Sequence, residues 1–165
     1  MLKDILKTKG QKSMMAILLA VVIFVSIATG FGGHSSPASG ADNQVLQQAA
    51  ANYFERLPDN MNKIKEAELK QLVDNNDQSI YLIDIRDAKD FSAGHIQGAH
   101  NIPFREVGRN MNSLPKDKTL IVYCHTGQTA GQTVAALNIA GFKARSLNGG
   151  MNNGWKAQQY PTVTD

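Results

Sequence analysis

The chain has 165 residues, of which 42% are hydrophobic and 19% are charged, so it can form one globular domain with a sizeable core. Its formal net charge of +3 comes from the N-terminus, because the first twelve residues contain four lysines and one aspartate, whereas 13 basic and 13 acidic residues follow from Asp42 onward. This balance excludes the basic surface that nucleic-acid binding requires, so we expect no nucleic acid among the partners.

The N-terminus reads as a targeting segment. Lysines precede a nearly unbroken apolar run from Met14 to Thr29, which predicts an N-terminal hydrophobic helix within residues 1–29. Small residues at Ser39 and Ala41 favour cleavage of a signal peptide, while their distance from the apolar run favours an uncleaved membrane anchor, and both alternatives stay open. In either case the positive-inside rule predicts an exported, extracytoplasmic domain, in the periplasm or at the cell surface, that meets the membrane only through this segment.

Two connecting segments follow. Residues 30–41 are rich in Gly, Ser and Pro and predict a flexible linker. Residues 42–62 predict an amphipathic helical extension, with Asp42 as N-cap and Pro58 as the stop. We expect its apolar side to pack on the domain, and a partner-binding helix is the alternative.

The remaining residues, 63–165, predict an α/β domain. Apolar spacing indicates a helix from Ile64 to Val73 and another from Thr129 to Ala140, the second closed by Gly141. Three runs indicate strands: SIYLIDI, TLIVYC and FKARSL. Continuous apolar strands that are separated by helices favour a central, mainly parallel sheet with helices on both faces.

Cys124 is the only cysteine, so no intramolecular disulfide can form. It ends a predicted buried strand and precedes a short loop with Gly127 and then a helix, which is where open α/β sheets bind ligands. Main-chain N–H groups of such a loop, together with the helix N-terminus, favour a negative atom and lower the pKa of a thiol. The alternative is a small buried hydrophobic residue, and the loop favours the nucleophile.

Three segments resemble signatures of the rhodanese family. YLIDIRDAKDFSAGHIQGAHNIPF is similar to its first signature, VYCHTGQTA to its active-site loop, and SLNGGMNNGWKAQQYP to its closing signature. They occur in the family's order and cover about residues 64–163. One additional residue separates the Gly149–Gly150 pair from Trp155 compared with the family's usual spacing, which leaves the form of that turn open.

The resemblance implies a sulfurtransferase whose Cys124 alternates between thiolate and persulfide. It would take sulfur from a small sulfur-containing anion such as thiosulfate, or from a persulfide donor, and pass it to cyanide or a thiol, with no metal or organic cofactor. We expect the loop residues to bind the substrate, with Arg86 as a further candidate; the loop residues are His125, Thr126, Gly127, Gln128, Thr129 and Ala130.

The residues of the Cys124 loop also bear on two alternatives to a sulfurtransferase, a phosphatase and a noncatalytic sulfur carrier. Related phosphatases use Cys-x5-Arg, but Ala130 occupies the place of that arginine, which argues against phosphatase activity. His125 stands where the family often has Arg, and this neutral loop motivates a second hypothesis, a noncatalytic sulfur carrier or sensor outside the membrane. His125 could stabilise the thiolate or the leaving sulfite, or it could point away from the site.

Six residues near these signatures have structural interpretations. Asp84 and Arg86 are expected to form an ion pair that anchors loops, in preference to direct substrate contact by Arg86. For His95 we expect a hydrogen-bonded structural role, because Gly94 and Gly98 indicate a tight turn. Trp155 is expected in the core, and the Gly149–Gly150 pair is expected to allow close backbone approach near the pocket.

Overall fold

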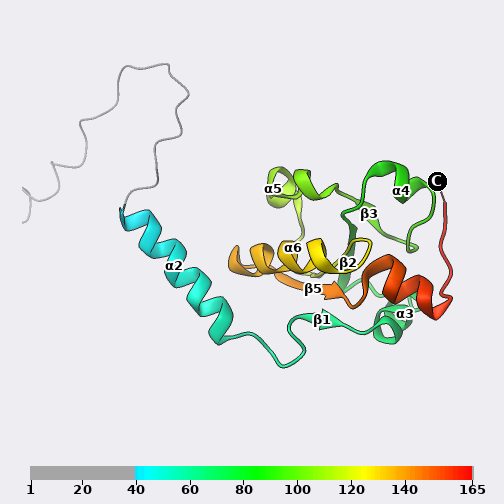
Figure 1. Cartoon of the computed structure of the whole chain (residues 1–165), viewed down its shortest axis with the longest axis horizontal. Helices are drawn as coiled ribbons and strands as arrows, with labels where there is room; N and C mark the ends of the chain where they lie inside the picture. The colour runs from blue at the N-terminus through cyan, green and yellow to red at the C-terminus, as the bar shows by residue number, and fades with distance from the viewer. Residues whose placement is uncertain (1–39, 165) are drawn as a thin grey trace, which may run out of the picture. The chain divides into compact units, whose positions relative to one another are not determined.

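Five parallel strands form the centre of the described chain (Figure 1). The structure is a computed structural model that describes residues 40–164, within one compact unit, so the predicted N-terminal hydrophobic helix and nearly all of the linker lie outside the described residues. The sheet order is β1-β5-β4-β2-β3, and every pair is parallel. The strands are β1 (Lys63–Ile64), β2 (Ile80–Asp84), β3 (His100–Asn101), β4 (Thr119–Tyr123) and β5 (Lys143–Leu147). The α/β class and the parallel sheet are confirmed.

Helices pack against both faces of this sheet. They are α5 (Val107–Asn110) and α6 (Gln128–Ile139) on one face, and α3 (Glu66–Asp74) and the π-helix η3 (Gly150–Trp155) on the other. The remaining short segments are α4 (Ala88–Ser92) and the 3₁₀ turns η1 (Phe104–Glu106), η2 (Met111–Ser113) and η4 (Lys156–Gln158). Successive residues of β4 point to opposite faces: Val122 packs with Val134 and Leu137 of α6, whereas Tyr123 packs with Leu69 of α3. This two-sided burial explains why the strands are continuously apolar. Among residues 40–164 no helix has the length and apolar character needed to cross a membrane.

One predicted helix starts later than the apolar spacing indicated. Ile64 is a strand residue, fully buried in β1 and paired with Leu147, and α3 begins only at Glu66. Lys65 between them has extended backbone angles, φ −72° and ψ 150°. The helical spacing of Ile64 relative to the apolar residues of α3 does not reflect a shared helix. Ile64 is held in an extended conformation because β1 pairs with β5, which is distant in sequence. The other long helix, α6, agrees with the prediction to one residue at each end, and Gly141 follows it with φ +89°.

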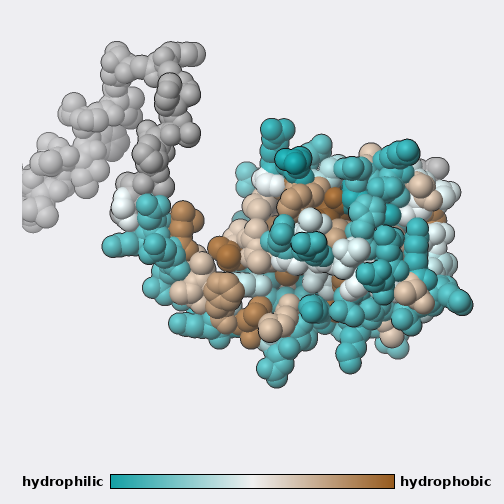
Figure 2. All heavy atoms as spheres, viewed as in Figure 1, coloured by the Kyte–Doolittle hydropathy of each residue, from teal (hydrophilic) through white to brown (hydrophobic). Residues whose placement is uncertain are grey.

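The N-terminal helix α2 (Gly40–Glu55) packs on the domain with only part of its surface. It begins before Asp42, which lies in the first turn and is not the N-cap. Ala49 and Tyr53 line a hollow of about 390 Å³ together with Ile139 at the end of α6. Other apolar side chains of this helix stay exposed: Val45 by 69%, Leu46 by 60% and Phe54 by 71%. Figure 2 shows hydrophobic surface along the helix. The expected packing of the apolar side is therefore right only in part, because Ala49 and Tyr53 meet the domain whereas Leu46 and Phe54 of the same apolar stripe are exposed.

Candidate active site

The fold places Cys124 at the carboxyl-terminal edge of the sheet. It follows the last residue of β4, and Gly127, with φ +93°, is the residue that precedes α6. A left-handed backbone of this kind is accessible to glycine without steric cost. The loop therefore turns sharply enough to aim its amides back toward the sulfur, and the N–H of Gly127 donates a hydrogen bond of 3.2 Å to Cys124 Sγ.

Cys124 is buried, with 5% of its surface exposed, but its sulfur is surrounded by donors. Burial alone would raise the pKa of the thiol. The Thr129 hydroxyl and the N–H groups of Ala130, Thr126 and Gly127 act in the opposite direction and together lower the pKa of Cys124 below its usual value. A sulfur held in this way carries a negative charge more readily than a free cysteine does, which makes it a nucleophile.

A second segment, residues 150–152, packs against the main chain of the Cys124 loop. The N–H of Met151 donates to the Cys124 carbonyl at 2.8 Å, and the N–H of Asn152 donates to the His125 carbonyl at 2.8 Å. Gly150, with φ +60°, lies so close that a Cβ atom there would be 2.6 Å from the Cys124 carbonyl oxygen and 2.7 Å from the Gly127 nitrogen. The expected close approach at the glycine pair is thus present, against the main chain of the Cys124 loop.

The extra residue before Trp155 is accommodated by a π-helix. Residues Gly150–Trp155 form η3, and each hydrogen bond of a π-helix spans one residue more than a hydrogen bond of an α-helix does. Trp155 is 1% exposed in the core and donates from Nε1 to the Pro161 carbonyl at 2.8 Å. The insertion therefore leaves both the tryptophan and the support of the active-site loop in place.

His125 lies at the rim of the site and contacts a carboxylate. Its Nε2 is 3.3 Å from Asp90 Oδ2, and about half of each side chain is exposed, 50% for His125 and 46% for Asp90. Asp90 belongs to α4, which lies after β2 in the chain. Of the other predicted loop residues, Gln128 is exposed as the first residue of α6, whereas Thr126, Gly127, Thr129 and Ala130 converge on the sulfur.

Arg86 is anchored to protein groups. Its guanidinium donates to both carboxylate oxygens of Asp84 and, at 2.9 Å, to the Gly94 carbonyl. Asp84 is fully buried, and Arg86 is 5% exposed. Nearby, His95 stacks on Phe91 at 3.8 Å between ring centroids and is 3.0 Å from the Phe91 carbonyl through Nδ1. The expected structural roles of the ion pair and of His95 agree with these contacts.

A family model for the rhodanese-like domain matches residues 65–158, more than half of the chain. The chain belongs to the rhodanese family. It is 31% identical to the thiosulfate sulfurtransferase GlpE of Shewanella oneidensis, over 56% of this chain and 93% of that protein. It is 28% identical to the putative sulfur carrier protein YrkF of Bacillus subtilis, over 67% of this chain, and it spans only 61% of that protein's length. The solution structure of the rhodanese-like domain of Anabaena Alr3790 superimposes with a TM-score of 0.56 at 30% identity, over 62% of this chain and 79% of that one.

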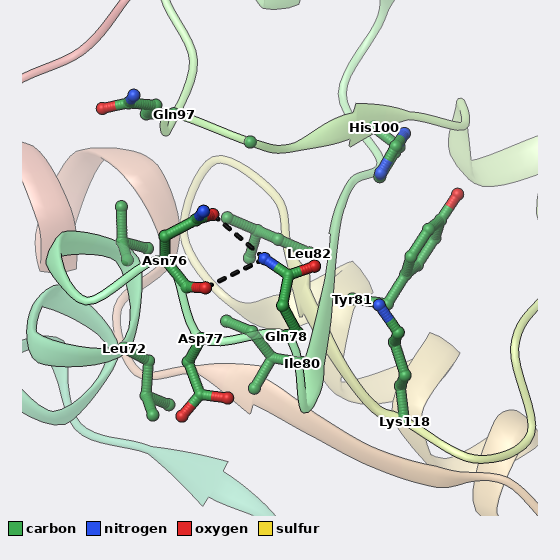
Figure 3. A pocket seen from close by; sticks show the side chains of 12 residues that line it. Leu72, Asn76, Asp77, Gln78, Ile80, Tyr81, Leu82, Gln97, His100 and Lys118 are labelled. Atoms are coloured by element: carbon green, nitrogen blue, oxygen red, sulfur yellow. Dashed lines mark hydrogen bonds between the residues drawn. The ribbon is translucent and has the colours of Figure 1, made fainter.

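A separate hollow lies at the other end of the strands of this rhodanese-like domain. It has a volume of about 220 Å³ and is lined by Tyr81 near the start of β2, Lys118 just before β4, and His100 of β3 (Figure 3). The Tyr81 and His100 rings stack with centroids 4.3 Å apart. Cys124 follows the opposite end of β4, so this hollow is separate from the site around Cys124.

Sequence reasoning missed Asp90 as a residue of this site. The aspartate stands in the first family signature, beside Phe91, and is far from His125 in the chain. The available signal was positional: α4 follows β2 as the Cys124 loop follows β4, and β2 and β4 are neighbouring parallel strands in register, Asp84 opposite Tyr123. Segments that leave the same edge of a parallel sheet meet there.

Proposed function

We propose that this protein is a sulfurtransferase that moves a sulfane sulfur from thiosulfate or a persulfide donor to a thiophilic acceptor through a persulfide on Cys124. The observation that carries the proposal is the set of donors around Cys124 Sγ: the Thr129 hydroxyl and the amides of Thr126, Gly127 and Ala130. A structural cysteine is buried as a small hydrophobic residue, and four hydrogen-bond donors around its sulfur are not needed for that role.

The chemistry proceeds in two displacements. The Cys124 thiolate attacks the outer sulfur of thiosulfate; the new S–S bond forms as the bond to the sulfonate sulfur breaks, and the electron pair leaves on sulfite. An acceptor thiolate or cyanide then attacks the outer sulfur of the Cys124 persulfide and restores the thiolate. Each step conserves charge and electrons, so no further oxidant or reductant is needed.

The loop has a defined task in each displacement. The inner sulfur is negative before the first step, and the outer sulfur is negative between the steps. Fixed N–H donors that face this point stabilise both states without rearrangement, as preorganised donors do at other anionic centres. We further propose that His125 and Gln128 contact the molecule that supplies the sulfur. Arg86 is the weakest candidate for such a contact, because its N–H groups already donate to Asp84 and Gly94.

The names of the relatives support the reaction class. GlpE carries the name thiosulfate sulfurtransferase, and an Allochromatium vinosum relative at 30% identity is named sulfurtransferase. YrkF carries the name of a putative sulfur carrier. These names suggest sulfane sulfur as the cargo, and the identity of the donor and acceptor remains part of the proposal.

We further propose that the domain works outside the cytoplasm. The support is the order of lysines, apolar run and Gly/Ser-rich linker before Asp42 in the sequence, of which residues 1–39 lie outside the described part of the chain. Protease treatment of intact cells, with the outer membrane opened where one is present, would test this: an extracytoplasmic domain is degraded while the cytoplasmic membrane stays intact, whereas a cytoplasmic one is protected.

Thiocyanate formation tests the sulfurtransferase proposal. The purified protein is mixed with thiosulfate and cyanide, and Cys124→Ser serves as the control. We expect turnover by the wild type and a background rate for the variant. Equal rates would remove Cys124 from the reaction, and a stable persulfide without turnover would instead favour the noncatalytic carrier.

A further inference from the structure

The rim of the proposed sulfur site carries a carboxylate. Asp90 Oδ2 lies 3.3 Å from His125 Nε2, and His125 directly follows the nucleophile in the chain. The side chain of His125 thus connects Asp90 to the Cys124 loop. With 46% of its side chain exposed, Asp90 faces solvent and can act on a molecule that approaches the loop.

No positive side chain of the loop offsets this carboxylate permanently. Residues 124–129 contain neither Lys nor Arg, and His125 is the only loop side chain that can gain a positive charge. The buried Arg86 is paired with Asp84, so its charge is already compensated. Outside the loop, Lys63 lines a hollow together with Thr126 and Gly127, whereas Asp90 lies beside His125. A dianionic donor that approaches Cys124 on the side of His125 therefore meets the negative charge of Asp90.

We propose that Asp90, held by His125, is a specificity-determining residue that disfavours donors of high negative charge. The inference rests on the proposed sulfur transfer at Cys124. It assigns the site to sulfane-sulfur donors with one negative charge or none, such as organic persulfides and thiosulfonates, in preference to the thiosulfate dianion. Asp90 does not take part in bond making; it acts through its field on the donor and on the departing sulfite.

The size of the effect follows from Coulomb's law. For a donor that comes within about 6 Å of the Asp90 carboxylate in water, one unit charge on Asp90 changes the affinity for each unit of donor charge by about threefold. Its removal should raise kcat/KM for thiosulfate by about tenfold and for a monoanionic donor by about threefold. The ratio of the two constants is thus expected to rise by about threefold, and this gain should shrink at high salt because the side chains are exposed.

Methanethiosulfonate is the probe that isolates the charge. It has the same outer sulfur as thiosulfate, with a methyl group in place of one oxygen and one negative charge fewer. The assay measures kcat/KM for both donors, with cyanide as acceptor, in the wild type and in Asp90→Asn. Asp87→Asn is the matched control, because this substitution removes the same charge. Asp87 is exposed just before α4 and makes no capping side-chain hydrogen bond. Asp90→Glu keeps the charge at the same position.

We expect the thiosulfate to methanethiosulfonate ratio to rise about threefold in Asp90→Asn, to change much less in Asp87→Asn, and to stay near the wild-type value in Asp90→Glu. An unchanged ratio in Asp90→Asn, or an equal rise in Asp87→Asn, overturns the role of Asp90. A general structural defect would lower both constants together and leave the ratio constant. Failure of the wild type with both donors would instead contradict the proposed sulfur transfer itself.

Discussion

Replacement of Gly150 by alanine should damage the Cys124 loop by direct steric contact. Gly150 has φ +60°, and a Cβ atom would lie 2.6 Å from the Cys124 carbonyl oxygen and 2.7 Å from the Gly127 nitrogen. A left-handed alanine costs about 1–2 kcal/mol, and overpacking against fixed backbone adds about 1–3 kcal/mol. We therefore expect Gly150→Ala to lower the free energy of unfolding by about 2–5 kcal/mol.

Urea denaturation measures this loss, and Gly141→Ala separates its two causes. Gly141 also has a positive φ, +89°, but its Cβ would meet nothing within 4 Å, so only the backbone cost of about 1–2 kcal/mol applies. Sulfur transfer should also fall in Gly150→Ala, because the displaced Gly127 amide is a donor to Cys124 Sγ. Equal stability of the two variants, with full activity of Gly150→Ala, would refute the proposed support of the loop.

Two further predictions concern the thiol and the buried ion pair. Thr129→Val removes a hydroxyl donor and should raise the pKa of Cys124, so that alkylation by iodoacetamide requires a higher pH than in the wild type. Thr133→Val, which removes a hydroxyl bound to the Thr129 carbonyl, should leave that pH profile unchanged, and a common shift would argue against a specific bond to the sulfur. Asp84→Asn leaves the buried guanidinium of Arg86 uncompensated and should cost about 3–5 kcal/mol in thermal unfolding, whereas a loss below about 1 kcal/mol would contradict the pairing.

The Cys124 loop could be predicted because its determinants are local. A continuous apolar run, a cysteine, a glycine and a helical pattern follow one another, and the structure places them as β4, Cys124, Gly127 and α6. Local backbone preferences also explain why Gly141 marks the end of that helix so well. Elements whose pattern and neighbours agree can be assigned from the chain alone.

The elements that depend on distant segments could not be assigned in this way. Ile64 has helical spacing but pairs with Leu147, and nothing near Ile64 reveals that partner. The extra residue before Trp155 was visible as a change of spacing, yet the choice of a π-helix over a longer loop depends on the packing of Trp155 in the core. The contact between His125 and Asp90 likewise requires the order of the strands in the sheet.

Intact-mass measurement tests the central claim most directly. The wild type and Cys124→Ser are incubated with thiosulfate or polysulfide, freed of small molecules and weighed without reductant. We expect the wild type to gain the mass of one sulfur atom, to lose it on addition of cyanide, and the variant to gain nothing. A wild type that acquires no sulfur from any donor, or a variant that acquires it equally, would contradict a persulfide on Cys124.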